Sequence, residues 1–175
     1  MTVINMTLDQ SSIEAALKRV EAMRTALRAN ESAFVATLAE EGAQAARAAV
    51  ADGVGDEQNS IDSAGVRSAV TVTGSGTSRA VTATGPQLSF VEFGTGVVGS
   101  GTYPDSEALA RAGWAYDQRR TPSAHDADDP TMWYWSHSDG LVHSTHGMAA
   151  NAFMLAGAEH MRSRLSALAK ETFRF

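Results

Sequence analysis

The sequence predicts one α+β domain that spans residues 1–175, with a long N-terminal helix, a small antiparallel β-sheet made of hairpins, and a C-terminal amphipathic helix packed on the sheet. Three observations support this fold class. Apolar residues recur at helical spacing at both ends of the chain, residues 66–84 alternate around a glycine-rich turn, and an Asp-Gly pair separates two further β-rich runs. A length of 175 residues is typical of a single domain.

The N-terminal helix is predicted from residue 7 to about residue 52. Its apolar residues are spaced by three, four or seven: Ile13, Leu17, Val20, Met23, Leu27, Phe34 and Leu38. Thr7 or Asp9 is expected to cap its start. A helix of that size would be about 68 Å long at 1.5 Å per residue, which exceeds one compact domain. We therefore expect it either to kink near Asn30 or to project from the body.

The predicted sheet begins with a hairpin. Residues 66–73 alternate as a β-strand, residues 74–78 form a turn, and residues 80–84 form the second strand. Between residues 61 and 104 the chain has only four charged side chains, Asp62, Arg67, Arg79 and Glu92. This low charge indicates a sheet with one covered face, and the long helix is the expected cover.

A long loop and a Trp-rich hairpin at about 97–146 are expected as an insertion in the domain. Residues 88–96 form an apolar element with a single acid, after which residues 97–131 lack periodicity over a length that is unusual for a loop. Asp139-Gly140 predicts a two-residue turn between strands 132–137 and 141–145. The final helix is expected from residue 149 to about residue 172.

Composition excludes several classes of protein. The net charge of −6 argues against tight binding of nucleic acid, and the absence of cysteine excludes disulfides and thiolate chemistry. No apolar run approaches a membrane span, and the N-terminus does not resemble a signal peptide, so we expect no membrane contact. All three Trp and all three Tyr fall between residues 103 and 135. This clustering makes the inserted region the place where partner contacts are expected.

The histidines suggest a metal-dependent hydrolase as an alternative function, with His137, His143 and His146 beside the acidic run at 126–129. The two-residue turn, however, places His137 opposite Val142 and sends the side chains of His137 and His143 to opposite faces. No three ligands then converge as a zinc site requires. We expect surface histidines and no cofactor.

Two further motifs have structural interpretations. Gly94-x-Gly96-x-x-Gly99 has the spacing of a phosphate-binding loop, but no helix is predicted after it, which favours a glycine hinge. Glu92 has no visible partner for acid–base chemistry, so a structural role is favoured. In the hairpin, Trp133 and Trp135 share one face, where core packing and interface anchoring remain equally open.

One motif resembles a known family. Residues Phe90-Val91-Glu92-Phe93-Gly94-Thr95-Gly96 resemble the Val-Glu-Phe/Tyr-Gly-Thr core of the tail-completion, or head–tail joining, proteins in the neck of long non-contractile-tailed bacteriophages. That family shares the order of helix, small sheet, motif and C-terminal helix, with a small residue and then Phe at the start of the last helix. Residues 145–153, ending in Phe153, hold that position. The family often has Pro before the Phe, where this chain has Ala152.

The resemblance implies a structural virion protein and no enzymatic activity. It implies a homo-oligomeric ring, expected to be hexameric, that joins tail to head and lets DNA pass as cargo. The implied partners are neighbouring neck and tail proteins, namely a head-completion or tail-terminator ring and the tail tube. The implied location is the virion, and the host cytoplasm during assembly. A protein-interaction adaptor outside phages remains a further alternative. The residues expected at interfaces are Phe90, Glu92, Phe93, Gly94, Thr95, Trp114, Tyr116, Trp133, Tyr134, Trp135 and Phe153.

Overall fold

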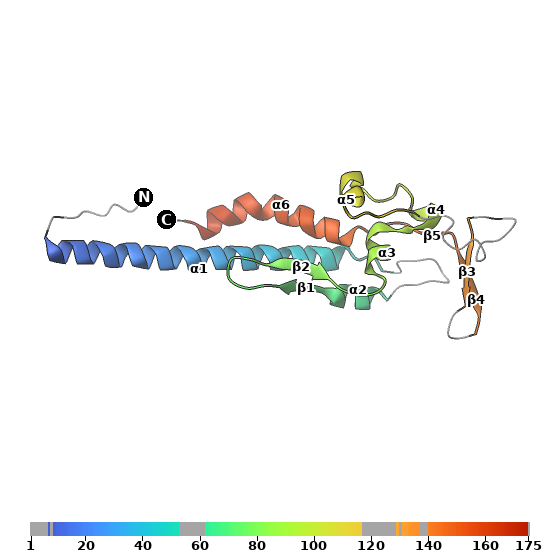
Figure 1. The fold of residues 1–175 in the computed structure, drawn as a ribbon, viewed down its shortest axis with the longest axis horizontal. Coiled ribbons are helices and arrows are strands. Elements are labelled where there is room, and N and C mark those ends of the chain that lie inside the picture. Colours follow the sequence, from blue (N-terminus) through green and yellow to red (C-terminus); the bar gives the residue numbers. More distant parts are fainter. Residues whose placement is uncertain are drawn as a thin grey trace.

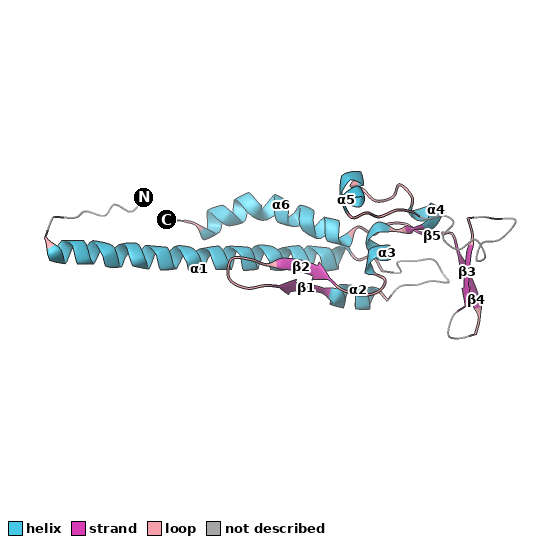
Figure 2. Ribbon diagram, in the orientation of Figure 1, coloured by secondary structure: helices cyan, strands magenta, loops and turns pink. Residues whose placement is uncertain are grey.

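The computed structural model describes residues 7, 9–52, 62–116, 129, 131–136 and 140–174, of which residues 133, 135 and 136 are described as backbone only. The chain is elongated, with the long helix α1 (Gln10–Ala49) as its axis and the C-terminal helix α6 (Phe153–Thr172) running beside it (Figure 1). Two small β-hairpins, four short helices and a two-residue strand complete the described elements (Figure 2). The predicted α+β class is confirmed, with helix as the larger part.

Helix α1 is a single unbroken helix of 40 residues. The expected kink near Asn30 is therefore wrong, and the alternative, that the helix projects from the body, is correct. At 1.5 Å per residue it is about 60 Å long. Asp9 caps its start, because the Asp9 Oδ1 atom accepts the backbone N–H of Ser12 at 2.9 Å. The first half of the helix extends beyond the end of α6 (Figure 1).

Helix α6 packs along α1, which corrects the expectation that it would pack mainly on the sheet. The reason is a seam of small residues. A Cβ atom added at Gly157 would lie 2.7 Å from the carbonyl oxygen of Gly42, and Ala43 and Ala46 are fully buried nearby. Beyond this seam, the Arg164 Nε atom donates to the Glu41 carboxylate at 2.9 Å. Small side chains let the two helix backbones approach closely, and that approach fixes the pairing.

The first hairpin lies along another side of α1 (Figure 1). Strands β1 (Val70–Thr73) and β2 (Ala80–Ala83) pair antiparallel, with Val70 opposite Ala83. The prediction of a strand over residues 66–69 is wrong, because Ser63–Ala69 forms helix α2. Val66 and Val70 are four residues apart, so their spacing suits one helical turn as well as a strand. Both side chains are buried.

The hydrophobic core lies where the C-terminal half of α1, the start of α6, α2, β1 and α3 (Leu88–Phe93) meet. Two arginines connect the elements of this region by hydrogen bonds to backbone carbonyls. The Arg47 guanidinium donates to the Val70 carbonyl at 2.9 and 3.2 Å, and the Arg67 guanidinium donates to the Val50 carbonyl at 2.7 Å. Seven residues form the buried cluster: Ala43, Ala46, Val50, Val66, Val70, Val91 and Phe153.

The segment expected to be irregular contains two short helices, α4 (Gly96–Gly99) and α5 (Ser106–Arg111). Asp105 caps α5, since its Oδ1 atom accepts the Ala108 N–H at 2.8 Å. The periodic apolar pattern needed to predict a helix does not develop in four or six residues, which explains why the sequence did not indicate them.

The second hairpin pairs β3 (Trp133–Ser136) with β4 (Val142–Thr145). Its register differs from the prediction by one residue, because Ser136 lies opposite Val142 and Trp135 opposite His143. The connection therefore spans residues 137–141 rather than a two-residue turn, and residues 137–139 lie outside the described part of the chain. After β4, the short strand β5 (Gly147–Met148) bridges to Thr95 and Gly96.

Candidate functional site

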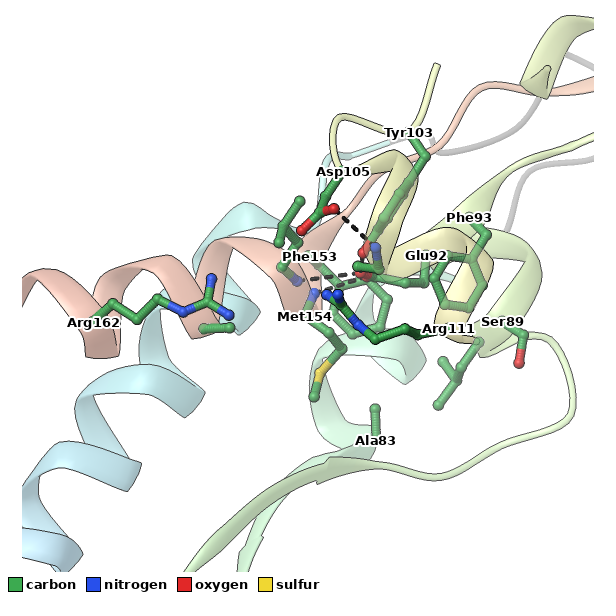
Figure 3. Close-up of a pocket in the computed structure, with 14 residues that line it drawn as sticks. Ala83, Ser89, Glu92, Phe93, Tyr103, Asp105, Arg111, Phe153, Met154 and Arg162 are labelled. Atoms are coloured by element: carbon green, nitrogen blue, oxygen red, sulfur yellow. Dashed lines mark hydrogen bonds between the residues drawn. The ribbon is translucent and has the colours of Figure 1, made fainter. Parts of the chain in front are cut away.

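The motif residue Glu92 lies at the centre of a buried polar site. Its side chain is only 6% exposed. The Glu92 Oε2 atom accepts the Met154 N–H at 2.8 Å, and the Oε1 atom accepts the Leu155 N–H at 3.2 Å and the Tyr103 hydroxyl at 2.9 Å (Figure 3). Three donors thus surround one buried carboxylate.

This carboxylate caps helix α6 from a distant part of the chain. The residue before the helix, Ala152, offers no side-chain acceptor and has a left-handed backbone with φ of 53°. The first N–H groups of a helix need acceptors, and a negative charge at that end also interacts favourably with the helix dipole. Glu92 supplies both, and the Ala152 N–H donates in turn to the Glu92 carbonyl at 3.0 Å.

The rest of the motif binds the segment that leads into α6. The Asn151 N–H donates to the Val91 carbonyl at 2.8 Å, and the Met148 N–H donates to the Thr95 hydroxyl at 3.2 Å. Gly94 has a φ of 78°, and a Cβ atom there would lie 2.7 Å from the Met148 carbonyl oxygen. A glycine is therefore required by both conformation and space. The residues of the motif thus bind the backbone of this segment through both backbone and side-chain groups.

The Gly94-x-Gly96-x-x-Gly99 spacing also belongs to this connection. Its last four residues form the short helix α4, which the sequence does not predict, whereas the next helix, α5, begins only at Ser106. Gly96 pairs with Gly147 in an isolated antiparallel bridge, and a side chain on Gly147 would collide with the Thr95 carbonyl oxygen. The glycines thus allow the two backbones to approach closely.

An aromatic cluster covers the outer side of the motif. The ring of Phe93 lies between Tyr103 and Trp114, with centroid distances of 5.0 and 5.3 Å, and Phe90 meets Trp114 edge-on at 5.6 Å. The Tyr116 hydroxyl donates to the Phe93 carbonyl at 2.7 Å. Burial raises the pKa of both tyrosines, and for Tyr103 the charge of Glu92 and its hydrogen bond raise the pKa further. The cluster anchors the beginning of the inserted region to the body.

A pocket of about 380 Å³ opens beside Glu92 between α3, α5 and α6 (Figure 3). Both acids that line it are engaged in helix capping, Glu92 for α6 and Asp105 for α5. Its two arginines are Arg111, which pairs with Glu107 at 3.5 Å, and Arg162 on the exposed side of α6. The pocket arises where two capped helices meet.

The structure brings together most of the interface residues expected from the sequence. Phe90 and Phe93 both contact Trp114, and Tyr116 binds the Phe93 carbonyl. Phe153 is fully buried behind Glu92. Tyr134 is 37% exposed on β3, in the separate second hairpin. The side chains of Trp133 and Trp135 lie outside the described part. Sequence reasoning missed Tyr103, because a tyrosine in a stretch without periodicity carries no signal of its distant carboxylate partner.

The histidines do not gather into a metal site in the described part of the chain. The His146 Nε2 atom contacts the Asp129 Oδ2 atom at 2.8 Å, and His143 lies opposite Trp135. The Thr131 hydroxyl and His146 lower the pKa of Asp129 to about 2. Among the residues described, no three His, Asp or Glu side chains are placed to hold an ion. His137 and residues 126–128 lie outside that set.

Comparison of the chain with protein families, curated proteins and solved structures finds no match. Within the described residues, none of the helices combines the length and the apolar character needed to cross a membrane.

Proposed function

We propose that this chain is a structural subunit of the neck of a long-tailed, non-contractile bacteriophage, where it completes the tail or joins it to the head. The proposal rests on the Val-Glu-Phe-Gly-Thr motif and on what this motif does in the fold. Glu92 caps α6, while Gly94 and Thr95 bind the segment before it. A motif that makes these contacts maintains a helix–sheet–helix body, which suits an assembly subunit.

The subunit is proposed to form a homo-oligomeric ring, with six copies as the expected number. The elongated shape supports this view, because α1 extends beyond the body and the second hairpin lies at the opposite end (Figure 1). A net charge of −6 suits a wall that DNA passes without binding, since attraction to phosphates is absent. The proposed partners are the adjacent rings of the neck and the tail tube.

The experiment that tests this proposal is a gene deletion in a phage that encodes the chain, followed by electron microscopy. We expect filled heads and separate tails in the deletion, and joined particles when the wild-type gene is supplied in trans. The control is a deletion strain supplied with an unrelated protein. Joined, infectious particles without the chain would sink the proposal. The presence of portal, capsid and tail-tube genes beside its gene offers a rapid first check.

The two alternative functions predict different results. A metal-dependent hydrolase would bind a stoichiometric metal ion, which elemental analysis of the purified protein measures. An adaptor outside phages would be found in complexes without any virion protein. Neither gains a specific observation from the described residues.

A further inference from the structure

The first half of α1 carries an apolar stripe without a partner among the described residues. Its large apolar side chains are Ile13, Leu17, Val20, Met23 and Leu27, which are between 38% and 59% exposed. Their spacing places them on one face of the helix. We call residues 10–30 the N-terminal arm. Contiguous apolar surfaces of this kind mark sites of interaction, because water solvates them poorly.

The stripe continues an interface that already exists within the molecule. Farther along α1 the same face meets α6, and Phe173, just beyond the end of α6, contacts Phe34 with the ring centroids 5.6 Å apart. Helix α6 ends at Thr172, so the stripe loses its cover just where the arm begins (Figure 1). The arm therefore presents the surface that α6 covers elsewhere, and a helix or groove from another molecule would extend it.

The charge of the arm differs in sign from that of the rest of the chain. Within residues 10–30, four basic side chains outnumber two acidic ones, which gives +2. Because the whole chain carries −6, the remaining residues carry −8. Two arms would repel each other, whereas an arm and the remainder of a second copy attract. The basic residues are Lys18, Arg19, Arg24 and Arg28.

We propose that the N-terminal arm of one copy docks on residues 31–175 of a second copy of this chain. The contact is heterologous, because the arm and the surface that receives it are different parts of the molecule. Heterologous contacts generate rings when the rotation closes. The inference rests on the proposed function only for the statement that the copies close into a ring. The docking itself depends on the stripe and the charges.

The test uses the purified full-length chain and two variants with equal charge changes. Leu17→Glu together with Val20→Glu places carboxylates in the stripe. Ala22→Glu together with Ala29→Glu places them on the exposed opposite face of the same helix. Glutamate favours helix, and these positions lie outside the buried core, so both variants are expected to fold. Unfolding curves for both variants check this point.

Sedimentation is measured at about 50 mM salt, where electrostatic attraction extends over more than ~10 Å. We expect concentration-dependent association of the wild type and at least a tenfold weaker association of the stripe variant. The opposite-face variant also brings the net charge of the arm from +2 to zero, so we expect it to associate less strongly than the wild type and more strongly than the stripe variant. About 1 M salt is expected to weaken the association of the wild type. A wild-type chain that stays monomeric, or two variants that lose association equally, overturns the proposal.

A photo-cross-linking amino acid at position 20 identifies the occupant, with position 22 as the matched control. We expect a product between position 20 and residues 31–175 of another copy, and little product from position 22. A product between two arms, or one within a single chain, overturns the proposal. Presence or absence of the chain at the head–tail junction tests the proposed function separately, so the two ideas can fail independently.

Discussion

The carboxylate of Glu92 accepts the backbone N–H of Met154 at 2.8 Å, which connects the end of α3 to the first turn of α6 across 62 residues of chain. Such a contact adds a long-range restraint at a helix end, where backbone donors otherwise lack partners. It also gives the short motif a physical purpose. The acid, the glycine and the threonine each satisfy or accommodate the backbone of the opposite segment.

Replacing Glu92 by Gln is expected to destabilise the fold by about 1–3 kcal/mol, the usual effect of weakening buried hydrogen bonds to a charged group. The amide keeps the shape, but its NH₂ group would face one of the backbone donors. The matched control is Glu107→Gln, since the Glu107 side chain is 85% exposed, and it should change stability by less than about 0.5 kcal/mol. Urea unfolding measures both. Equal midpoints for the two variants would contradict the capping role.

The hydrogen bond from Tyr103 to Glu92 predicts a dependence of stability on alkaline pH. Burial and the neighbouring negative charge raise the pKa of Tyr103 above the value of about 10 that it has in the unfolded chain. The folded state then holds the phenolic proton more tightly. Its contribution is complete below pH ~10 and is lost as the pH rises toward the raised pKa.

Tyr103→Phe isolates this effect, because Tyr116 and Tyr134 remain in both proteins. We expect the wild type to exceed the variant in stability by about 1–3 kcal/mol at neutral pH. That difference should shrink as the pH is raised above ~10. Urea unfolding from pH 7 to pH 11.5 provides the measurement. A difference that stays constant over this range would show that Tyr103 ionises equally in both states.

Gly94 and Gly101 form a matched pair that separates crowding from backbone strain. Their φ angles are 78° and 77°, yet a Cβ atom would lie 2.7 Å from backbone atoms at Gly94 and would meet nothing within 4 Å at Gly101. Gly101→Ala should cost about 1–2 kcal/mol, the strain of an L-residue in that conformation. Gly94→Ala should cost more than ~3 kcal/mol, because a fixed backbone must also move. Similar losses in thermal unfolding would argue against the close approach of residues 148–150.

Ala152 departs from the proline common in the family that the motif resembles, and its backbone explains the departure. Proline holds φ near −65°, whereas Ala152 has a φ of 53° and donates its N–H to the Glu92 carbonyl at 3.0 Å. Ala152→Pro should therefore destabilise the chain by about 3 kcal/mol or more.

Ala152→Gly tests the same conformation in the opposite direction. Glycine adopts a positive φ without the penalty of a side chain, so it should leave stability unchanged or raise it by up to about 1 kcal/mol. Denaturant unfolding of both variants compares them with the wild type. A tolerated proline would mean that the start of α6 has a different backbone in solution.

The long periodic helices of this fold can be predicted from the sequence. Which elements pack against each other is harder to predict. The stripe from Ile13 to Leu38 extends over seven turns, and helix α1 follows it with a cap at Asp9. Helix α6 packs on α1 because Gly42 and Gly157 have no side chains that would hold the two helix backbones apart. Apolar periodicity does not register a missing side chain, so the sequence favours the sheet over α1 as the neighbour of α6.

The sequence identifies the residues of the candidate site, but it does not predict how they are arranged or which groups they contact. Glu92 and its neighbours were singled out by their motif, while the donors that surround the carboxylate are mostly backbone groups of Met154 and Leu155. Every residue type except proline has a backbone N–H group, so the residue types at these positions do not reveal which N–H groups bind the carboxylate. The register of the second hairpin failed for a related reason, since Asp139-Gly140 favours a tight turn without excluding a longer one.

The bridges from Thr95 to Met148 and from Gly96 to Gly147 bring the two ends of the inserted region together at a single point. A loop closed at its base can change in length with little effect on the rest, because each doubling adds only about 0.6 kcal/mol of closure entropy. Changes of length and sequence are therefore tolerated in the part of the inserted region that follows the anchoring residues Tyr103, Trp114 and Tyr116. Over evolution the chain can exchange its hairpin for a different element while α1 and α6 keep their positions, and an engineer could graft a foreign peptide near Gly140 for the same reason.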